Sequence, residues 1–399
     1  MQSSSRPLLI KLFNSLPIAS SLELNALLKA AKKKSGIPDF EDKSFLVGLE
    51  KLLHGIQTEA QLHAFGKFIT KQRLVNVLAN RLRVEEILRQ HPEITSIEIK
   101  APIIITGLQR TGTTRLHRLF SSHPQVRSLK SWEALHPVPL KNDVSNQQRI
   151  SFAKTAEKAL KYMSPEFFAI HPVEHAAPEE DILLNDMTFV STVPEATMHL
   201  PSYAQWVEKQ SHLEAYQYVK KVLQILTYQN PNERWVLKTP QYIEFLEEAT
   251  TVFPDAKFIH TYRDPLKVLP SFFSMVYHSR KIFSDQVSAE LGAKHWLHKN
   301  SYMMDKAMKF WKTHDTSHTM HVSYYDMLQN PMEEMKKIYA FVGLEFDSDS
   351  QQKLVEVDQK NTQNKYGVHK YDLTDFNLSK ADIENAFELY RTTFNIPYE

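Results

Sequence analysis

The sequence contains no cysteine and few glycines. Without cysteine, the chain of 399 residues can form no disulfide bond and can offer no thiolate for catalysis. This absence fits a reducing compartment, and we expect a cytoplasmic protein. No apolar run approaches the roughly 18–20 residues that a membrane helix needs, and no signal peptide is recognised at the N-terminus. The formal net charge of +2 gives no general attraction to polyanions, so neither a nucleic-acid partner nor a membrane span is expected.

Two of the nine glycines lie five residues apart in the segment 103–114, which reads IIITGLQRTGTT. Its β-branched start predicts a buried strand, and the apolar spacing after it predicts a helix. The free N–H groups of such a turn, together with the helix dipole, attract an anion. A tight turn that only needs positive φ at one glycine is the simpler alternative. The clustering of scarce glycine with three threonine hydroxyls favours the anion site.

The segment departs from a nucleotide-hydrolysing P-loop at one position. Such a loop reads GxxxxGK[ST], and its lysine reaches the β- and γ-phosphates. Here Thr113 holds the lysine position, and Arg110 is the only cation inside the loop. The loop is therefore predicted to bind a phosphate-like group other than the γ-phosphate of ATP.

A second pattern lies around residue 263. The apolar segment 257–262 predicts a strand, Asp264 is a favourable N-cap and Pro265 a favourable first helical residue. Ser271 follows Arg263 by eight residues, about two turns into that helix. Either residue alone would be interpreted as an ordinary surface side chain.

Together these patterns resemble the sulfotransferase family that uses 3′-phosphoadenosine 5′-phosphosulfate (PAPS). The resemblance runs from about residue 101 to 395 and has further matches in segments 235–240, 253–259, 324–328 and 365–369. It implies that the 5′-phosphosulfate binds to the loop residues Arg110, Thr111, Gly112, Thr113 and Thr114. It also implies that Arg263 and Ser271 bind the 3′-phosphate. Lys365 and His369 are weaker candidates for nucleotide contacts.

The resemblance implies transfer of a sulfuryl group to a hydroxyl by in-line attack. The leaving phosphate gains negative charge, and Arg110 and Lys238 are the cations expected to stabilise it. Motifs typical of metal sites do not occur in the sequence, so no metal is expected. The acceptor is not identified, and a small molecule, a lipid and a carbohydrate all remain open.

The general base is less clear than the nucleotide site. Cytosolic small-molecule members of the family use a histidine where this chain has Pro240, which cannot transfer a proton. Other branches use a glutamate about twenty residues beyond the loop, and Glu133 matches it. We expect Glu133 to be the base, although a lone glutamate is usually a solvated surface group. His171 and His175 are the alternatives, and the acidic residues 179–181 are interpreted as the first turn of a helix.

The predicted fold class is α/β, a P-loop-like three-layer fold with a central parallel sheet flanked by helices. Residues 1–95 are expected to form a helical N-terminal subdomain, which could cover the acceptor site or form a homodimer. Residues 96–399 are expected to form the α/β domain, with a mostly helical insertion at about 146–230. Strands are predicted at 102–106, 126–129, 234–238, 257–262 and 319–323.

The insertion is rich in aromatic residues, which could form an acceptor pocket or simply pack in the core. They are Phe167, Phe168, Phe189, Tyr203, Trp206, Tyr216 and Tyr218. Two other functions stay open besides sulfuryl transfer. One is a non-catalytic module that only binds the nucleotide, and the other is a P-loop kinase, against which Thr113 in the lysine position argues.

Overall fold

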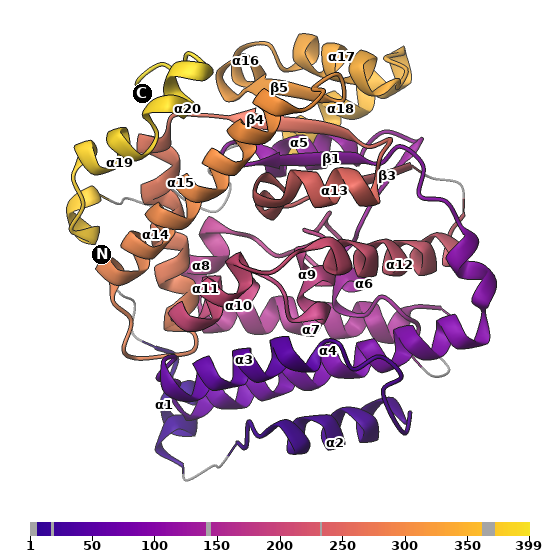
Figure 1. Cartoon of the computed structure of the whole chain (residues 1–399), viewed down its shortest axis with the longest axis vertical. Coiled ribbons are helices and arrows are strands. Elements are labelled where there is room, and N and C mark those ends of the chain that lie inside the picture. Colours follow the sequence, from indigo (N-terminus) through magenta and orange to yellow (C-terminus); the bar gives the residue numbers. More distant parts are fainter. Residues whose placement is uncertain (1–5, 17–19, 141–144, 232–233, 361–371) are drawn as a thin grey trace.

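The computed structural model describes residues 6–16, 20–140, 145–231, 234–360 and 372–399. Its centre is a sheet of five parallel strands in the order β2-β3-β1-β4-β5 (Figure 1). The strands are β1 (Ile103–Gly107), β2 (Val126–Ser128), β3 (Arg234–Lys238), β4 (Lys257–Tyr262) and β5 (Thr319–Ser323). All five predicted strands are confirmed, and so is the fold class.

The central strand β1 is apolar on both sides because helices cover both faces of the sheet. Ile103 and Ile105 face one core, and Ile104 faces the other. The first face carries α5 (Thr113–Phe120), α17 (Pro331–Val342) and α18 (Ser348–Lys360). The second carries α12 (Leu213–Gln229), α13 (Leu246–Val252), α14 (Pro265–Lys281) and α15 (Ala289–Thr313).

The expected helical insertion forms a layer between the sheet and the N-terminal helices (Figure 1). It contains α7 (Gln147–Met163), α8 (Pro165–Ile170), α9 (Ile182–Asn185), η2 (Asp186–Thr188), α10 (Val193–Thr197), α11 (Pro201–Glu208) and α12. The short α6 (Ser131–Leu135) lies beside it. The N-terminal part is helical as predicted, with α1 (Leu8–Ser15), α2 (Leu24–Ser35), α3 (Leu46–Thr58), α4 (Ala64–Gln90) and η1 (Pro92–Ser96).

The N-terminal helices do not enclose a core of their own. Leu49 of α3 and Leu78 of α4 pack in one cluster with Leu200 and Tyr203, which belong to the insertion. Val84 of α4 packs in the main core under the sheet. The domain boundary near residue 95 therefore stays a prediction, since the two parts share buried surfaces.

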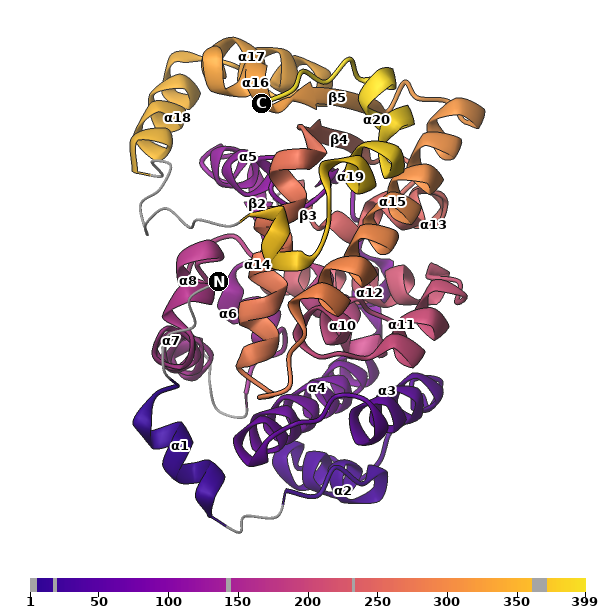
Figure 2. The ribbon, with the colours of Figure 1, turned by 90° about the vertical axis from the view of Figure 1, so that its left-hand side faces the viewer.

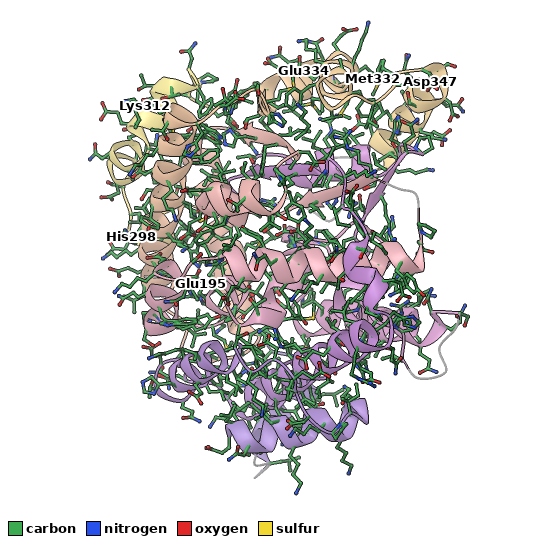
Figure 3. The ribbon with its side chains drawn as sticks, turned by 45° about the vertical axis from the view of Figure 1, so that its right-hand side comes forward. Glu195, His298, Lys312, Met332, Glu334 and Asp347 are labelled. Atoms are coloured by element: carbon green, nitrogen blue, oxygen red, sulfur yellow. The ribbon has the colours of Figure 1, made fainter. Side chains whose placement is uncertain are left out.

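Two long helices connect the layers. Figure 2 shows α14 running from the sheet towards α3 and α4. Along α15, His298 and Lys312 lie on the outer edge of the molecule, whereas Glu195 of α10 lies inside beside that helix (Figure 3). Helix α15 thus exposes one face and packs the other against α10 and α14. None of the described helices is both long and apolar enough to cross a membrane.

The remaining elements lie around the sheet. They are η3 (Pro240–Phe245), α16 (Tyr324–Gln329), η4 (Leu373–Phe376), α19 (Lys380–Ala386) and α20 (Glu388–Thr393). The last segment returns to the end of β4, where Arg391 forms an ion pair with the buried Asp264. This contact brings the final residues next to Arg263.

Candidate active site

One cavity of about 820 Å³ lies at the carboxyl ends of β1, β3 and β4. Arg110 follows β1, Thr239 follows β3 and Arg263 follows β4, and all three residues line the cavity. The carboxyl edge of a parallel sheet is where open α/β folds bind their ligands. Every residue that lines the cavity lies at position 109 or later, so the described N-terminal helices do not cover it.

The turn after β1 is shaped by close packing against β4. A Cβ atom at Gly107, whose φ is +146°, would lie 2.5 Å from the carbonyl oxygen of Thr261. Thr111 is buried, and its Oγ1 contacts the Leu108 carbonyl at 2.6 Å and Thr261 Oγ1 at 2.7 Å. The side chain of Thr111 therefore holds the turn together, and the residue does not line the cavity.

The next residues open onto the cavity. Gly112, with φ +93°, is the N-cap of α5, and it lines the cavity together with Thr113 and Thr114. A Cβ at Gly112 would come within 3.1 Å of the Tyr324 ring, so the bare backbone is needed there. The first amides of α5 and two hydroxyls are thus presented at a helix N-terminus, as the anion hypothesis requires.

The Arg263–Ser271 pattern folds as predicted. Asp264 caps α14, because its Oδ1 accepts a hydrogen bond of 2.9 Å from the Leu266 N–H. Two turns later, Ser271 Oγ accepts a hydrogen bond of 3.1 Å from Arg110 Nε. Arg263 Nη1 is 3.4 Å from the Arg110 carbonyl oxygen. The structure thus brings two distant motifs, the loop and the start of α14, to one end of the cavity.

Lys238 ends β3 directly behind the cavity. Its Nζ is 2.5 Å from Oε1 of Glu180, which lines the cavity, and its backbone N–H donates to Asp181 Oδ1 at 2.9 Å. Tyr242 donates to the other oxygen of Asp181, whose pKa burial raises to about 6. The interpretation of residues 179–181 as a helical first turn is wrong, because α9 begins only at Ile182. Instead, Glu180 and Asp181 hold Lys238, and Glu179 and Glu180 line the cavity.

Glu133 lies outside the cavity lining. It is 3% exposed, its Oε1 is 2.5 Å from Arg127 Nη2, and its Oε2 accepts from the Lys130 N–H at 3.0 Å. Both oxygens therefore have partners that hold α6 and β2 together. This position argues against the expected role of Glu133 as the base, which stays untested.

The two alternative histidines differ in position. His171 lines the cavity, and burial lowers its pKa to about 4, so its imidazole is neutral near pH 7. His175 does not line the cavity, and its Nδ1 is 2.7 Å from Glu157. Lys365 and His369 lie outside the described residues.

The aromatic residues of the insertion mostly pack in the core. Of those named above, Phe167 alone lines the cavity. Phe189 and Tyr203 belong to the cluster beneath the N-terminal helices, and Tyr216 and Tyr218 belong to the main core. The sequence could not show which aromatic residues line a pocket and which pack in the core, because both positions require an apolar side chain.

The polar groups of the cavity fit a nucleotide that carries two separate anionic groups. Positive charge gathers at the loop after β1, where Arg110, the N-terminus of α5 and the neighbouring Lys238 lie. The guanidinium of Arg263 provides a second group of hydrogen-bond donors. Gly112 lines the cavity and has no side chain, so its backbone faces this space. In the described part of the chain, no three acidic or histidine side chains converge as metal ligands. The expectation that no metal takes part stays a prediction.

Comparison with known proteins identifies the family. Residues 102–348 match the profile described as the sulfotransferase family. The chain belongs to this family. It is similar to the crystal structure of sulfotransferase STF1 from Mycobacterium tuberculosis H37Rv, with 26% identity and a TM-score of 0.81. That match covers 92% of this chain and 99% of the other.

A second solved structure shows the same fold. Sulfotransferase STF9 from Mycobacterium avium is 22% identical, with a TM-score of 0.86, and the match covers 96% of this chain and 99% of the other. No curated protein matches the sequence. The resemblance inferred from the loop and from Arg263 is therefore confirmed at the level of the family.

Proposed function

We propose that the protein transfers a sulfuryl group from PAPS to the hydroxyl of an acceptor. One observation carries the proposal. Arg110 of the loop and Arg263, which follows β4, line one end of a cavity that continues well beyond them, and the Ser271 hydroxyl contacts Arg110 beside that end. A cavity that binds a nucleotide at one end and leaves room at the other is what a group transfer needs.

The nucleotide contacts divide into two sets. The first set holds the 5′-phosphosulfate end. It consists of Arg110, the backbone amides at Gly112 and Thr113, and the hydroxyls of Thr113 and Thr114. Arg263 and Ser271 hold the 3′-phosphate, since an arginine fork suits a phosphate group. When bound, PAPS supplies a sulfuryl group activated by its bond to a phosphate. Membership of the sulfotransferase family supports this assignment.

Lys238 neutralises charge during the reaction. Its side chain is 4% exposed and is held by Glu180, so it needs little reorganisation to face a developing negative charge. A charge-assisted hydrogen bond of this kind contributes roughly 1.5–3 kcal/mol. Arg110 acts on the same side from the loop, and the two cations together replace the metal ion that phosphoryl-transfer enzymes use.

Glu180 accepts the proton of the acceptor hydroxyl. Its carboxylate lines the cavity beside Lys238, whereas both oxygens of Glu133 are held by other groups. The pair of Glu180 and Lys238 places a proton acceptor next to the cation that stabilises the leaving group. His171 also lines the cavity, but it is a weaker base than an ordinary histidine, because burial lowers its pKa to about 4.

Isothermal titration with 3′,5′-bisphosphoadenosine, 5′-AMP and ATP, without added metal, tests the proposal. We expect the bisphosphate to bind at least tenfold more tightly than the other two. Arg263→Ala should weaken binding of the bisphosphate more than that of 5′-AMP, which has no 3′-phosphate. The matched control is Arg89→Ala, an arginine on the exposed surface of α4.

The outcomes separate the alternatives. Preference for ATP would favour a kinase, and no binding of any nucleotide would overturn the proposal. Tight binding of the bisphosphate without sulfuryl transfer to any hydroxyl compound would favour a non-catalytic module. Equal losses for both adenosine nucleotides in Arg263→Ala would contradict the role of Arg263.

A further inference from the structure

The part of the cavity away from the loop has an apolar wall. Three helices, α10, α14 and α15, form this wall. We call its main residues the apolar arm: Val193 and Ala196 of α10, Phe272, Met275 and Val276 of α14, and Trp296 of α15. The only hydroxyls that these helices add to the lining are those of Thr197 and Ser279.

The charged lining residues come from other elements. Arg115 and Arg118 belong to α5, next to the loop, and pair with Asp358 and Glu174. None of the described lining residues from α10, α14 or α15 is charged. The cavity therefore has a charged end and an uncharged end.

The charges nearest the apolar arm already have partners behind its wall. Glu195 precedes Ala196 on α10, but it lies inside beside α15 (Figure 3) and its Oε2 is 2.8 Å from His295 Nε2. Arg280 follows Ser279 and donates to the Glu195 carbonyl oxygen at 2.7 Å. Neither side chain lines the cavity. A charged acceptor group in the arm would thus find no counter-ion there.

The length of the arm follows from α14. Ser271, Met275 and Ser279 are spaced four residues apart and lie on one face of this helix. At 1.5 Å per residue, eight residues span about 12 Å. Ser271 contacts the loop arginine, so the arm extends about that far from the nucleotide end. This distance matches an extended chain of about ten carbons or a system of two to three fused rings.

We infer that the acceptor is an apolar alcohol or phenol whose hydroxyl meets the nucleotide and whose body fills the apolar arm. This inference rests on the proposed function and names the substrate class of the same site. A sugar would bury several hydroxyls against carbon atoms, and each buried polar group without a partner costs about 1–3 kcal/mol. An apolar body, in contrast, gains from removing its own surface from water.

The test measures acceptor binding to the protein saturated with 3′,5′-bisphosphoadenosine. The probes for titration calorimetry are 1-decanol, 2-naphthol, methyl glucoside and N-acetylserine amide. We expect the first two to bind at least tenfold more tightly than the last two. Equal or tighter binding of the glucoside or the serine amide would overturn the inference, whereas failure of the bisphosphate itself to bind would count against the proposed function instead.

Two variants locate the binding to the arm. Ala196→Phe fills the arm, and Met275→Glu places a charge in it, and both should weaken 1-decanol binding at least tenfold. The matched control is Ala159→Phe, at an exposed position of α7. Bisphosphate affinity should be unchanged in all three and shows that each variant is folded. A folded Ala196→Phe or Met275→Glu variant that binds 1-decanol as the wild type does would overturn the inference.

Discussion

The carboxylate of Glu399 lies against the guanidinium of Arg263, with Oε1 2.8 Å from Nε and Oε2 2.9 Å from Nη2. The same guanidinium stacks on the Tyr324 ring, 4.0 Å from its centre. The Glu399 backbone N–H donates to Asp264 Oδ2 at 3.0 Å, which fixes the final residue at the start of α14. A carboxylate thus occupies the donor fork that we assign to the 3′-phosphate of the nucleotide, and the two anions must compete for it.

Removing the charge of Glu399 should therefore strengthen nucleotide binding. Partial burial opposes ionisation of this carboxyl, but the hydrogen bond and charge of Arg263 outweigh it and lower its pKa, so the group is charged at neutral pH. We expect Glu399→Gln to raise the affinity for 3′,5′-bisphosphoadenosine about three- to tenfold, which is about 0.7–1.4 kcal/mol. Titration calorimetry at low and high salt measures the change.

The control is Glu388→Gln, which removes an exposed carboxylate from the neighbouring helix α20. It should leave the affinity unchanged, and 5′-AMP should bind equally to all three proteins. If Glu399→Gln binds the bisphosphate no better than the wild type, the competition does not occur. If 5′-AMP gains as much as the bisphosphate, the gain does not come from the 3′-phosphate.

The choice of general base predicts a difference between two glutamates. Glu180→Gln should reduce kcat about 10²–10⁴-fold, because the acceptor hydroxyl loses its proton acceptor. Glu133→Gln should instead lower stability, because Arg127 loses its buried partner, and should keep most of kcat in the folded fraction. Sulfuryl transfer and urea unfolding, measured on both variants, check the pair. Loss of turnover in Glu133→Gln with Glu180→Gln active would restore the sequence-based assignment.

The sequence was sufficient for those features that depend on local patterns. Three features were predicted correctly because each involves only one helix or strand and the turn beside it. They are the β-branched run at residues 103–105, the Asp264 cap and the spacing from Arg263 to Ser271. Because the carboxyl ends of parallel strands meet at one edge, placing the strands also placed the loop next to Arg263. The expectation that the bound nucleotide is PAPS came from the family resemblance and not from the local patterns.

The rest of the site depends on contacts between distant segments. Glu180 and Lys238 are 58 positions apart, and no periodicity links them. Glu133 and Arg127 are only six apart, but their pairing depends on how β2 turns into α6, which sequence spacing does not reveal. The apolar arm could not be predicted either, because Phe272 of the arm and Phe273 of the core are the same residue type in the sequence.

Gly107 predicts a further, purely steric effect. A Cβ there would lie 2.5 Å from the Thr261 carbonyl oxygen, so β1 and β4 must separate at the loop. Gly107→Ala should destabilise the protein by about 1–3 kcal/mol and weaken bisphosphate binding. Gly343→Ala is the matched control, since its φ is also positive but no atom lies within 4 Å of the added carbon. Urea unfolding should show a clearly larger loss for Gly107→Ala, and equal losses would contradict the steric argument.

Buried neutral histidines predict how stability depends on pH. His212 is fully buried and stacks on the Phe245 ring, with the ring centres 3.5 Å apart. Burial lowers its pKa to about 3, whereas the unfolded chain has the ordinary value near 6.5. Between these two pH values the unfolded state binds more protons than the folded state. The contribution of the neutral His212 to the free energy of unfolding is therefore fully present above pH 6.5 and is lost as the pH falls. From pH 7 to pH 5, His212 alone should remove about 2 kcal/mol of the free energy of unfolding.

His212→Gln tests this, because glutamine does not titrate. The variant should be less stable than the wild type at pH 7, but its further loss between pH 7 and pH 5 should be smaller by about 2 kcal/mol. The exposed His298 provides the control, and His298→Gln should follow the wild type at both pH values. Urea unfolding at the two pH values measures the difference. An equal pH dependence in His212→Gln and the wild type would mean that His212 can be protonated in the folded protein, and its packing against Phe245 would then not exclude the charge.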